Sequence, residues 1–360
     1  ITPITTQITV TAKDAEKVYD GTPLTTKEVK VTKGSFADGE GFDYTVTGSQ
    51  TYAGNSDNEF TYAAKAGTKL TNYTVTTKYG KLTVKKSAEE IVITAPSADK
   101  KYDGKPLTVT SGATYSGTLA KGDTLMVTLA GSQTDAGSSA VTVASYKVMR
   151  GETDVTESYT FGESVPGTVT VTKRSVTLTS ATAEKAYDGT PLTAKTVNVS
   201  GDGFVTGESA TYAVTGSQLD AGKSDNVFTY TLGGNTKAEN YTIEVAYGTL
   251  TVNPITEKKI TVTANSNSKM YDGKPLTDNG YTYTEGVLVN GDVLTAVVEG
   301  TVTNVDDAAT QNIVKSYKVM RGTTDVTKNY TFEASVNGEL KITKRPVTLT
   351  SATASKAYDG

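Results

Sequence analysis

The chain has 360 residues, with 35 Lys and Arg against 39 Asp and Glu, and it contains neither His nor Cys. Without imidazole or thiol groups it can form no Ser-His or Cys-His nucleophile, no imidazole or thiolate metal site and no disulfide. A net charge of −4 with scattered basic residues argues against a nucleic-acid surface, and no apolar run reaches the ~20 residues of a membrane span.

A short motif recurs along the chain and indicates a tandem array. Its copies are Tyr19-Asp20-Gly21, Tyr102-Asp103-Gly104, Tyr187-Asp188-Gly189 and Tyr271-Asp272-Gly273, and a fifth begins at Tyr358. The intervals of 83, 85, 84 and 87 residues each suit one small domain. We interpret the motif as structural, a strand that ends in an Asp-Gly turn with its Tyr ring packed inward; the alternative is a binding tripeptide displayed once per repeat.

The repeats alternate between two types. Type A carries Ser-Asp-Asn-x-Phe-Thr-Tyr, and type B carries Ser-Tyr-Lys-Val-Met-Arg-Gly. In chain order we predict repeat 1 (1–86, type A), repeat 2 (87–173, type B), repeat 3 (174–254, type A), repeat 4 (255–344, type B) and, over 345–360, the first strand of a fifth, type A repeat.

The connections between repeats also differ. The connection from a type B to a type A repeat is little more than Lys-Arg. The connections from type A to type B are longer and comprise residues 85–90 and 253–259. Because a shorter connection leaves less freedom, we predict stiffer B-to-A joints and looser A-to-B joints.

Within each repeat, short alternating segments rich in Thr, Val and Tyr are separated by turn residues roughly every 8–12 positions. No helical period is present. This pattern predicts an all-β chain built of four small immunoglobulin-like β-sandwich modules, although a β-grasp-like module also fits. If strands of ~10 residues follow the long axis of each module, four modules in line form an elongated rod on the order of 150 Å.

Type B repeats carry a longer hairpin that is tipped by Arg-Gly. Tyr and Arg are common binding anchors, so its candidate binding residues are Tyr146 and Arg150 in repeat 2 and Tyr317 and Arg321 in repeat 4. The same hairpin could equally serve packing between modules.

Five sequence elements recur together: Lys-x-Tyr-Asp-Gly-x-Pro-Leu, Gly-Ser-Gln-x-x-Ala-Gly (48–54, 131–137, 216–222), Asp-Val-Thr-x-x-Tyr, Asn-Tyr-Thr and a closing Gly-x-Leu-x-Val (80–84, 248–252). As a set they resemble the YDG/MBG-type repeats of large Gram-positive bacterial surface proteins, over essentially the whole chain. Repeat 4 departs from the pattern with Gly-Thr-Val-Thr at 300–303. The resemblance implies stalk or adhesive modules outside the cell, attached to the cell wall through regions beyond this segment.

Many Gram-positive surface modules contain a Lys-Asn isopeptide bond, and the resemblance implies candidate partners for one. These are Lys17 with Asn72, Lys185 with Asn240, and Lys269 with Asn329. The alternative is a Lys that lies along the Tyr ring and an Asn that caps a turn. Repeat 2 has Ser158 at the Asn position, which would abolish the bond there.

We predict no cofactor. The acidic groups Asp38 with Glu40, Asp57, and Asp306 with Asp307 do not have the spacing of an EF-hand, which leaves calcium at module junctions as the alternative. We also predict no enzyme activity, because every acidic motif is duplicated or lies at a turn, whereas an active site is usually built once.

Two functional hypotheses follow. In the first, the repeats are structural spacers that project a distal domain from a bacterial surface. In the second, the repeats themselves bind host glycan, mucin or protein and gain strength from multivalency.

Overall fold

The computed structural model describes residues 7–305 and 310–360. The regular structure of these residues is β-strand apart from four single-turn 3-10 helices, which confirms the prediction of an all-β chain. No helix in the described ranges is long and apolar enough to cross a membrane. The chain divides into two compact units: unit 1 holds Ile1–Arg174 with Lys237–Thr242, and unit 2 holds Ser175–Thr236 with Ile243–Gly360.

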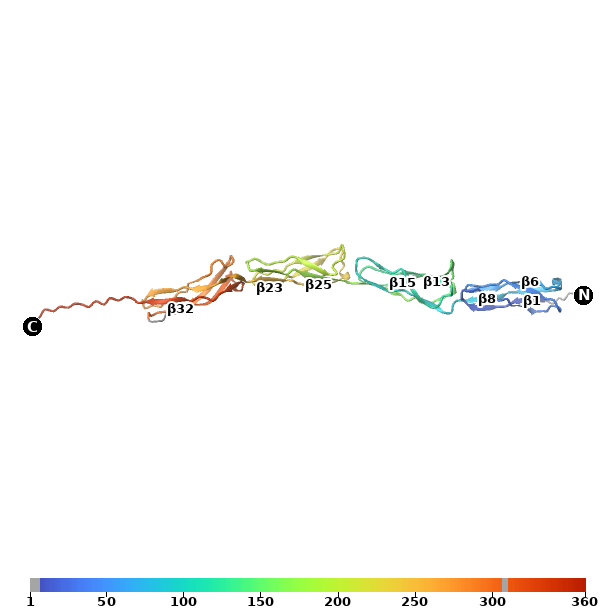
Figure 1. Cartoon of the computed structure of the whole chain (residues 1–360), viewed down its shortest axis with the longest axis horizontal. Helices are drawn as coiled ribbons and strands as arrows, with labels where there is room; N and C mark the ends of the chain where they lie inside the picture. The colour runs from blue at the N-terminus through green and yellow to red at the C-terminus, as the bar shows by residue number, and fades with distance from the viewer. Residues whose placement is uncertain (1–6, 306–309) are drawn as a thin grey trace. The chain divides into compact units, whose positions relative to one another are not determined.

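Repeat 1 forms a sandwich-like arrangement of small sheets, and Figure 1 labels three of its strands. Strand β1 lies between β3 and β7, β8 lies between β2 and β5, and β4 pairs with β6. Ile8 and Val10 of β1 pack against Phe42 and Phe60 of the β4–β6 pair. The elements are β1 (Gln7–Ala12), β2 (Ala15–Val18), β3 (Val29–Lys33), β4 (Phe42–Val46), β5 (Gly54–Asn58), β6 (Phe60–Ala64), the 3-10 helix η1 (Leu70–Asn72), β7 (Thr74–Lys78) and β8 (Gly80–Lys85).

The N-terminal segment of this repeat is divided between two sheets, and in each sheet it pairs with one of the last two strands. β1 pairs in parallel with β7 in one sheet, and its continuation β2 pairs in parallel with β8 in the other. Gly80 lies at the crossing, where an added Cβ would stand 2.4 Å from the carbonyl oxygen of Lys13. The glycine that opens the closing Gly-x-Leu-x-Val element is therefore required by the close approach of two backbones. Gly167 and Gly338 meet carbonyl oxygens in the same way in repeats 2 and 4.

Repeat 2 contains a larger sheet, because its strand β15 runs for 14 residues and pairs with both β18 and β13. Alternate residues of β18 are buried, which is the period of two expected for a strand with one face on the core. The elements are β9 (Glu90–Thr94), β10 (Ala98–Lys101), β11 (Leu107–Thr108), β12 (Thr114–Ser116), β13 (Asp123–Ala130), β14 (Ser132–Gln133), β15 (Gly137–Arg150), β16 (Thr153–Asp154), the 3-10 helix η2 (Thr156–Ser158), β17 (Thr160–Phe161) and β18 (Gly167–Thr172).

Repeat 3 has the element order of repeat 1, with the sheets β21-β19-β25 and β20-β26-β23 and the antiparallel pair β22–β24. The elements are β19 (Arg174–Ser180), β20 (Ala183–Ala186), β21 (Val197–Gly201), β22 (Ala210–Val214), β23 (Gly222–Asp225), β24 (Phe228–Leu232), the 3-10 helix η3 (Ala238–Asn240), β25 (Tyr241–Ala246) and β26 (Thr249–Asn253).

Repeat 4 has the larger sheet of repeat 2, in the order β29-β35-β32-β31 with β33 on β32. The elements are β27 (Ile255–Ile260), β28 (Val262–Ala264), β29 (Asn267–Met270), β30 (Tyr281–Tyr283), β31 (Asp292–Glu299), β32 (Thr310–Arg321), β33 (Thr324–Asp325), the 3-10 helix η4 (Thr327–Asn329), β34 (Tyr330–Phe332) and β35 (Gly338–Thr343).

The strand expected within 345–360 does not form. These residues have no regular structure and are exposed, Leu349 to 92%. The matching segment of repeat 3, β19, has its hydrogen-bond partners in β21 and β25, whereas the described residues offer 345–360 no such neighbours. Extended sequence alone does not make a strand, because the backbone groups need a ladder.

Candidate functional site: the joints inside each unit

The Tyr-Asp-Gly motif forms a locked turn at the end of β2. The ammonium of Lys17 lies 2.7 Å from Asp20 Oδ1, which also accepts a hydrogen bond from the Thr22 amide at 2.8 Å. These hydrogen bonds lower the pKa of the Asp20 carboxyl. Gly21 has φ +78°, and the Tyr19 amide donates to the Lys85 carbonyl at 2.9 Å, which extends the β2–β8 pairing by one bond. The turn therefore holds Tyr19 at the end of its own repeat.

The tyrosine ring is buried by the next repeat. Tyr19 keeps 5% of its surface exposed, and its ring meets that of Tyr159 edge-on, with centroids 5.4 Å apart. Val84 of repeat 1 shares a single hydrophobic cluster with Ile91 and Val148 of repeat 2. The core is therefore continuous across this joint.

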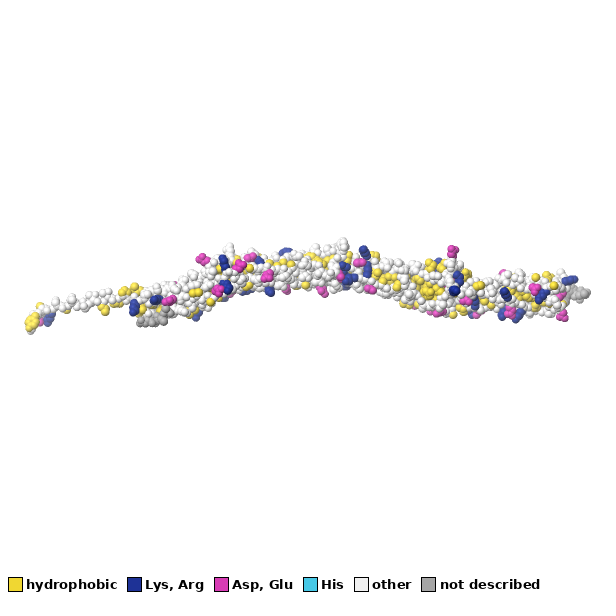
Figure 2. All heavy atoms as spheres, viewed as in Figure 1, with side chains coloured by type: hydrophobic (Ala, Val, Ile, Leu, Met, Phe, Trp, Pro, Cys, Tyr) yellow, Lys and Arg dark blue, Asp and Glu magenta, His cyan; other side chains and the backbone are white. Residues whose placement is uncertain are grey.

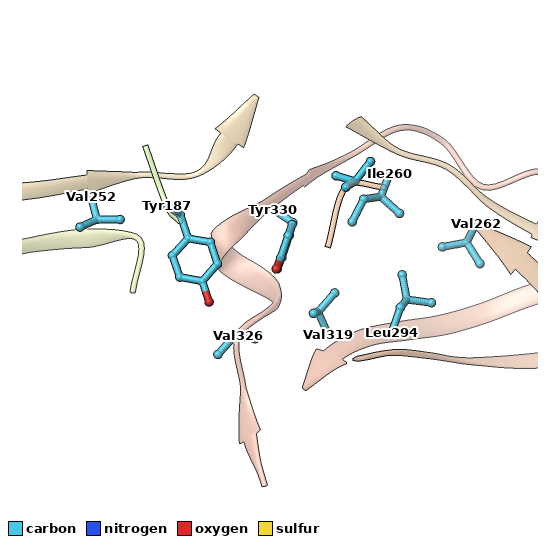
Figure 3. Close-up of a cluster of buried hydrophobic side chains, with 9 residues drawn as sticks. Tyr187, Val252, Ile260, Val262, Leu294, Val319, Val326 and Tyr330 are labelled. Atoms are coloured by element: carbon cyan, nitrogen blue, oxygen red, sulfur yellow. The ribbon is translucent and has the colours of Figure 1, made fainter. Parts of the chain in front are cut away.

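Unit 2 repeats the arrangement between repeats 3 and 4. Tyr187 is 3% exposed and meets Tyr330 with ring centroids 5.7 Å apart. Figure 3 shows Tyr187 between Val252 of repeat 3 and Tyr330 of repeat 4, beside the apolar side chains of repeat 4.

A buried carboxylate ties the two tyrosines together. In the first joint Asp123 Oδ2 accepts hydrogen bonds from the hydroxyls of Tyr19 at 2.9 Å and Tyr159 at 2.6 Å. The Asp123 side chain has no exposed surface, and Arg150 Nε lies 2.7 Å from its other oxygen. The two hydroxyl hydrogen bonds and the ion pair compensate part of the charge's loss of water, while Asp123 Oδ1 and Arg150 Nη2 have no hydrogen-bond partner among the described residues.

The second joint has the same four side chains. Asp292 accepts from Tyr187 at 3.0 Å and from Tyr330 at 2.6 Å, and Arg321 Nε lies 2.7 Å from it. Burial raises the pKa of Tyr330, and it raises the pKa of Tyr187 to about 12. We call these sets the joint clusters: Tyr19, Asp123, Arg150 and Tyr159 in the first joint, and Tyr187, Asp292, Arg321 and Tyr330 in the second.

The two arginines predicted as binding anchors belong to these clusters. The Arg150 guanidinium lies 5.9 Å from the centroid of the Tyr19 ring, and that of Arg321 lies 5.3 Å from Tyr187. A Cβ on Gly21 would stand 1.8 Å from Arg150 Nη2. The glycine of the motif thus leaves room for the arginine of the next repeat, in addition to adopting a positive φ.

Both A-to-B joints lie inside a compact unit and contain continuous core. The side chains at the ends of the repeats therefore contribute to these joints in addition to the connecting residues. The order of stiffness of the two kinds of joint stays a prediction.

A second contact joins the residue before the receiving tyrosine to a loop of the preceding repeat. Ser158 Oγ accepts from the Ala53 amide at 3.1 Å. Asn329 accepts from the Ala221 amide at 2.6 Å and donates to Asp220 at 2.9 Å. These loop residues belong to the Gly-Ser-Gln-x-x-Ala-Gly element, which sequence reasoning interpreted only as a loop. Its recurrence together with Asn-Tyr was the available signal for the contact.

The structure does not bring together the isopeptide candidates of repeat 1. Lys17 Nζ bonds to Asp20 and Thr22, and Lys17 pairs with Val84 in the ladder. Asn72 is exposed and lies two residues before Thr74, which pairs with Gln7. Gln7 precedes Lys17 by ten residues, or about 33 Å of extended chain.

The other candidates also have different partners. Lys185 lies 2.7 Å from Asp188, and Lys269 lies 2.9 Å from Asp272. Within unit 1, Asn240 accepts from the Ala136 amide at 2.6 Å, and the ring of the following Tyr241 lies 5.7 Å from Tyr102.

The remaining predicted site residues lie on the B-type hairpins. Tyr146 packs on Phe161 with centroids 4.3 Å apart, and Tyr317 stacks on Phe332 at 4.4 Å. Tyr146 is exposed, at 39%.

The acidic groups considered for calcium are dispersed. Glu40 accepts a hydrogen bond from the Tyr73 hydroxyl, whereas Asp38 and Asp57 are exposed. Asp306 and Asp307 lie outside the described residues. Over 7–305 and 310–360, no group of three or more acidic side chains is arranged to hold a metal ion.

Comparison of the chain with protein-family models and with curated protein sequences finds no match.

Proposed function

We propose that this chain is a structural spacer, a run of stalk repeats that projects a distal domain from a bacterial surface. The observation that carries the proposal is the burial of the motif tyrosines, Tyr19 and Tyr187, in the core of the following repeat. A joint with shared core resists bending, because bending would expose apolar surface and separate the buried Asp–Arg pair. The repeats act through shape and stiffness, with no catalysis and no cofactor.

The proposal includes a fold and a location. We propose that each repeat is an immunoglobulin-like sandwich, supported by two small facing sheets and by a first strand divided between them. Four such modules in line form an elongated rod. The resemblance to YDG/MBG-type repeats supports an extracellular, wall-attached setting, with attachment through regions outside this segment.

Small-angle X-ray scattering on the 360-residue chain tests the spacer, with and without calcium. We expect a maximum dimension on the order of 150 Å that calcium does not change. In a Tyr19→Ala/Tyr187→Ala double variant the joints bend, and the distance distribution broadens toward shorter values. The matched control is Tyr271→Ala, because this copy of the motif tyrosine is 41% exposed. A compact particle for the unmodified chain contradicts the spacer, and extension only with calcium contradicts the joint clusters as the source of stiffness.

The second candidate function is binding by the repeats themselves, to host glycan, mucin or protein. It is favoured by the exposure of Met126 (60%) on β13, whose side chain shares a face of the β13–β15 pair with Lys147, on the opposite side from Tyr146. Figure 2 shows hydrophobic side chains gathered over the part of repeat 2 where Figure 1 labels these strands. Charge reversal at Arg150 cannot test this idea, because it would break the first joint.

Surface substitutions separate binding from joint damage. Met126→Ser should weaken attachment to a mucin-coated surface if the repeats are adhesive, and should change nothing for a spacer. Thr128→Ser on the same strand is the control, since Thr128 is exposed and the change is small.

A further inference from the structure

The terminal strands of each repeat are neighbours and run in the same direction. In repeat 1, β2 pairs in parallel with β8, which is the last strand. β10 pairs in the same way with β18 in repeat 2, β20 with β26 in repeat 3, and β29 with β35 in repeat 4. We call these four pairs the terminal pairs.

This geometry determines how tension along the chain reaches a repeat. The chain enters at the start of the first strand and leaves at the end of the last strand. Because the two strands are parallel, pulling the chain ends apart draws them past each other in opposite directions. Every hydrogen bond of the pair is then loaded at once. An antiparallel hairpin pulled from its open end instead loses its bonds one at a time.

Each terminal pair has the same length and the same lock. In repeat 1 the register runs from Ala15↔Leu82 to Val18↔Lys85, and in repeat 4 it runs from Asn267↔Leu340 to Met270↔Thr343. The amide of the motif tyrosine adds a further bond in each copy, at 2.8–3.0 Å. The Lys–Asp pair then closes the turn immediately after the ladder, as it does between Lys17 and Asp20.

The last strand is also held by a second neighbouring strand and by its side chains in the core. β8 pairs in antiparallel register with β5, and Leu82 and Val84 are buried. Sliding β8 past β2 would therefore also break a second ladder and draw two apolar side chains out of the core.

We propose that the terminal pairs are shear clamps and that the array bears tension along its length. In this view the Lys-x-Tyr-Asp-Gly motif has two uses. It ends the clamp with a locked turn, and it inserts its tyrosine into the next repeat. The terminal pairs have the same length and the same turn in A and B repeats, so unfolding force depends little on repeat type.

The inference rests on the proposed function only for its biological use. A chain that scattering shows to be compact would contradict the spacer and would leave the clamp geometry of each repeat to be tested by force. Repeats that unfold at negligible force would contradict the clamp without affecting the length of the rod.

Single-molecule force spectroscopy on the 360-residue chain tests the proposal. The chain has no Cys, so two added cysteines are unique attachment points. With cysteines appended at the two ends, we expect four unfolding events. Each event releases about 83–87 residues, or roughly 300 Å of extended chain.

A change of pulling direction supplies the control on an otherwise identical protein. Asp43→Cys and Lys65→Cys attach the handles to exposed side chains at one end of the antiparallel β4–β6 pair, where Phe42 pairs with Ala64. This direction unzips the β4–β6 pair one bond at a time, and we expect its first rupture at a several-fold lower force than unfolding from the chain ends. Equal forces in the two directions, or end-to-end unfolding without resolved events, would overturn the proposal.

A substitution in one clamp provides an independent measurement. Lys269→Pro removes a backbone donor from the first strand of the repeat 4 pair. One of the four events should then move to lower force while three remain. If repeat 4 no longer folds in this variant, the pulling-direction experiment still decides the question. Four unchanged events would count against the clamp.

Discussion

Two copies of one motif, in repeats 3 and 4, have different surroundings. Both copies form the same turn, with Lys185 at 2.7 Å from Asp188 and Lys269 at 2.9 Å from Asp272. Yet Tyr187 is 3% exposed and bonds to Asp292, whereas Tyr271 is 41% exposed. The motif therefore builds its turn locally, and the burial of its tyrosine depends on the repeat that follows.

The comparison indicates that the motif stabilises the protein chiefly through its contacts across the joint. At the Tyr187 copy the tyrosine ring packs into the core of repeat 4. Two tyrosine hydroxyls and the carboxylate of Asp292, which pairs with Arg321, lose their contact with water at the same place. At the Tyr271 copy the same residues remain a surface turn. Matched substitutions at the two copies should therefore lower the free energy of unfolding by different amounts. The difference within each pair of variants measures one contribution of the joint.

The largest difference is expected for loss of the ring. Tyr187→Ala removes a buried aromatic side chain and should lower the free energy of unfolding by about 3–5 kcal/mol. Tyr271→Ala should cost less than about 1 kcal/mol. Urea unfolding of the full chain followed by circular dichroism measures both. Equal losses would mean that the tyrosine acts within its own turn.

Removal of the joint carboxylate is expected to cost about 3 kcal/mol. Asp292→Ala leaves Arg321 without its buried partner and leaves two tyrosine hydroxyls without their acceptor. Asp272→Ala, at the exposed turn of the same unit, is the control and should have a much smaller effect. A similar loss in both variants would show that the buried cluster adds nothing beyond the turn.

The motif glycines separate backbone strain from contact across the joint. Gly189 and Gly273 have φ of +79° and +80°, so alanine is strained by about 1 kcal/mol at either position. A Cβ on Gly189 would also meet Val289 at 2.6 Å, whereas a Cβ on Gly273 would meet nothing within 4 Å. We expect Gly189→Ala to cost about 1 kcal/mol more than Gly273→Ala. The same denaturation experiment would contradict close packing at the joint if the two losses agreed.

The second contact of the joint is expected to contribute least. Asn329→Ala removes an acceptor and a donor that bond to the Asp220–Ala221 loop, and should cost about 1–2 kcal/mol. Asn72→Ala should be close to neutral, because Asn72 is exposed. An equal cost at both positions would mean that the asparagine stabilises its own 3-10 turn.

High pH should loosen the joints before it affects the rest of the fold. Burial raises the pKa of Tyr187 from 10.0 to about 12, so the folded joint favours the neutral hydroxyl. Its contribution to stability is complete below pH 10 and is lost as the pH rises from 10 to about 12. Denaturation midpoints across this range measure the loss, and Tyr187→Phe should reduce the slope. If Tyr187→Phe left the dependence of stability on pH unchanged, the joint would not be the cause of that dependence.

The correct and incorrect sequence predictions have a common pattern. Strand content and the turn at Tyr-Asp-Gly are local properties, and a period of two with Asp-Gly punctuation expresses them directly. For Arg150 the sequence left binding and packing between modules open, because its partner, Asp123, is 27 residues away and no local pattern connects them. The isopeptide pairing was proposed without knowledge of the strand register, which separates Lys17 from Asn72.

The sequence alone determined that this protein is all-β and that its recurring Tyr-Asp-Gly motif makes a turn, because these properties depend on neighbouring residues in the chain. Only the tertiary structure decided that the motif tyrosine belongs to the core of the next repeat, and that the first and last strands run in parallel. Both depend on contacts between residues about 65 to 145 positions apart. Burial of an aspartate among two tyrosines and an arginine is stable only when all four side chains meet, which the spacing of residues along the chain does not reveal.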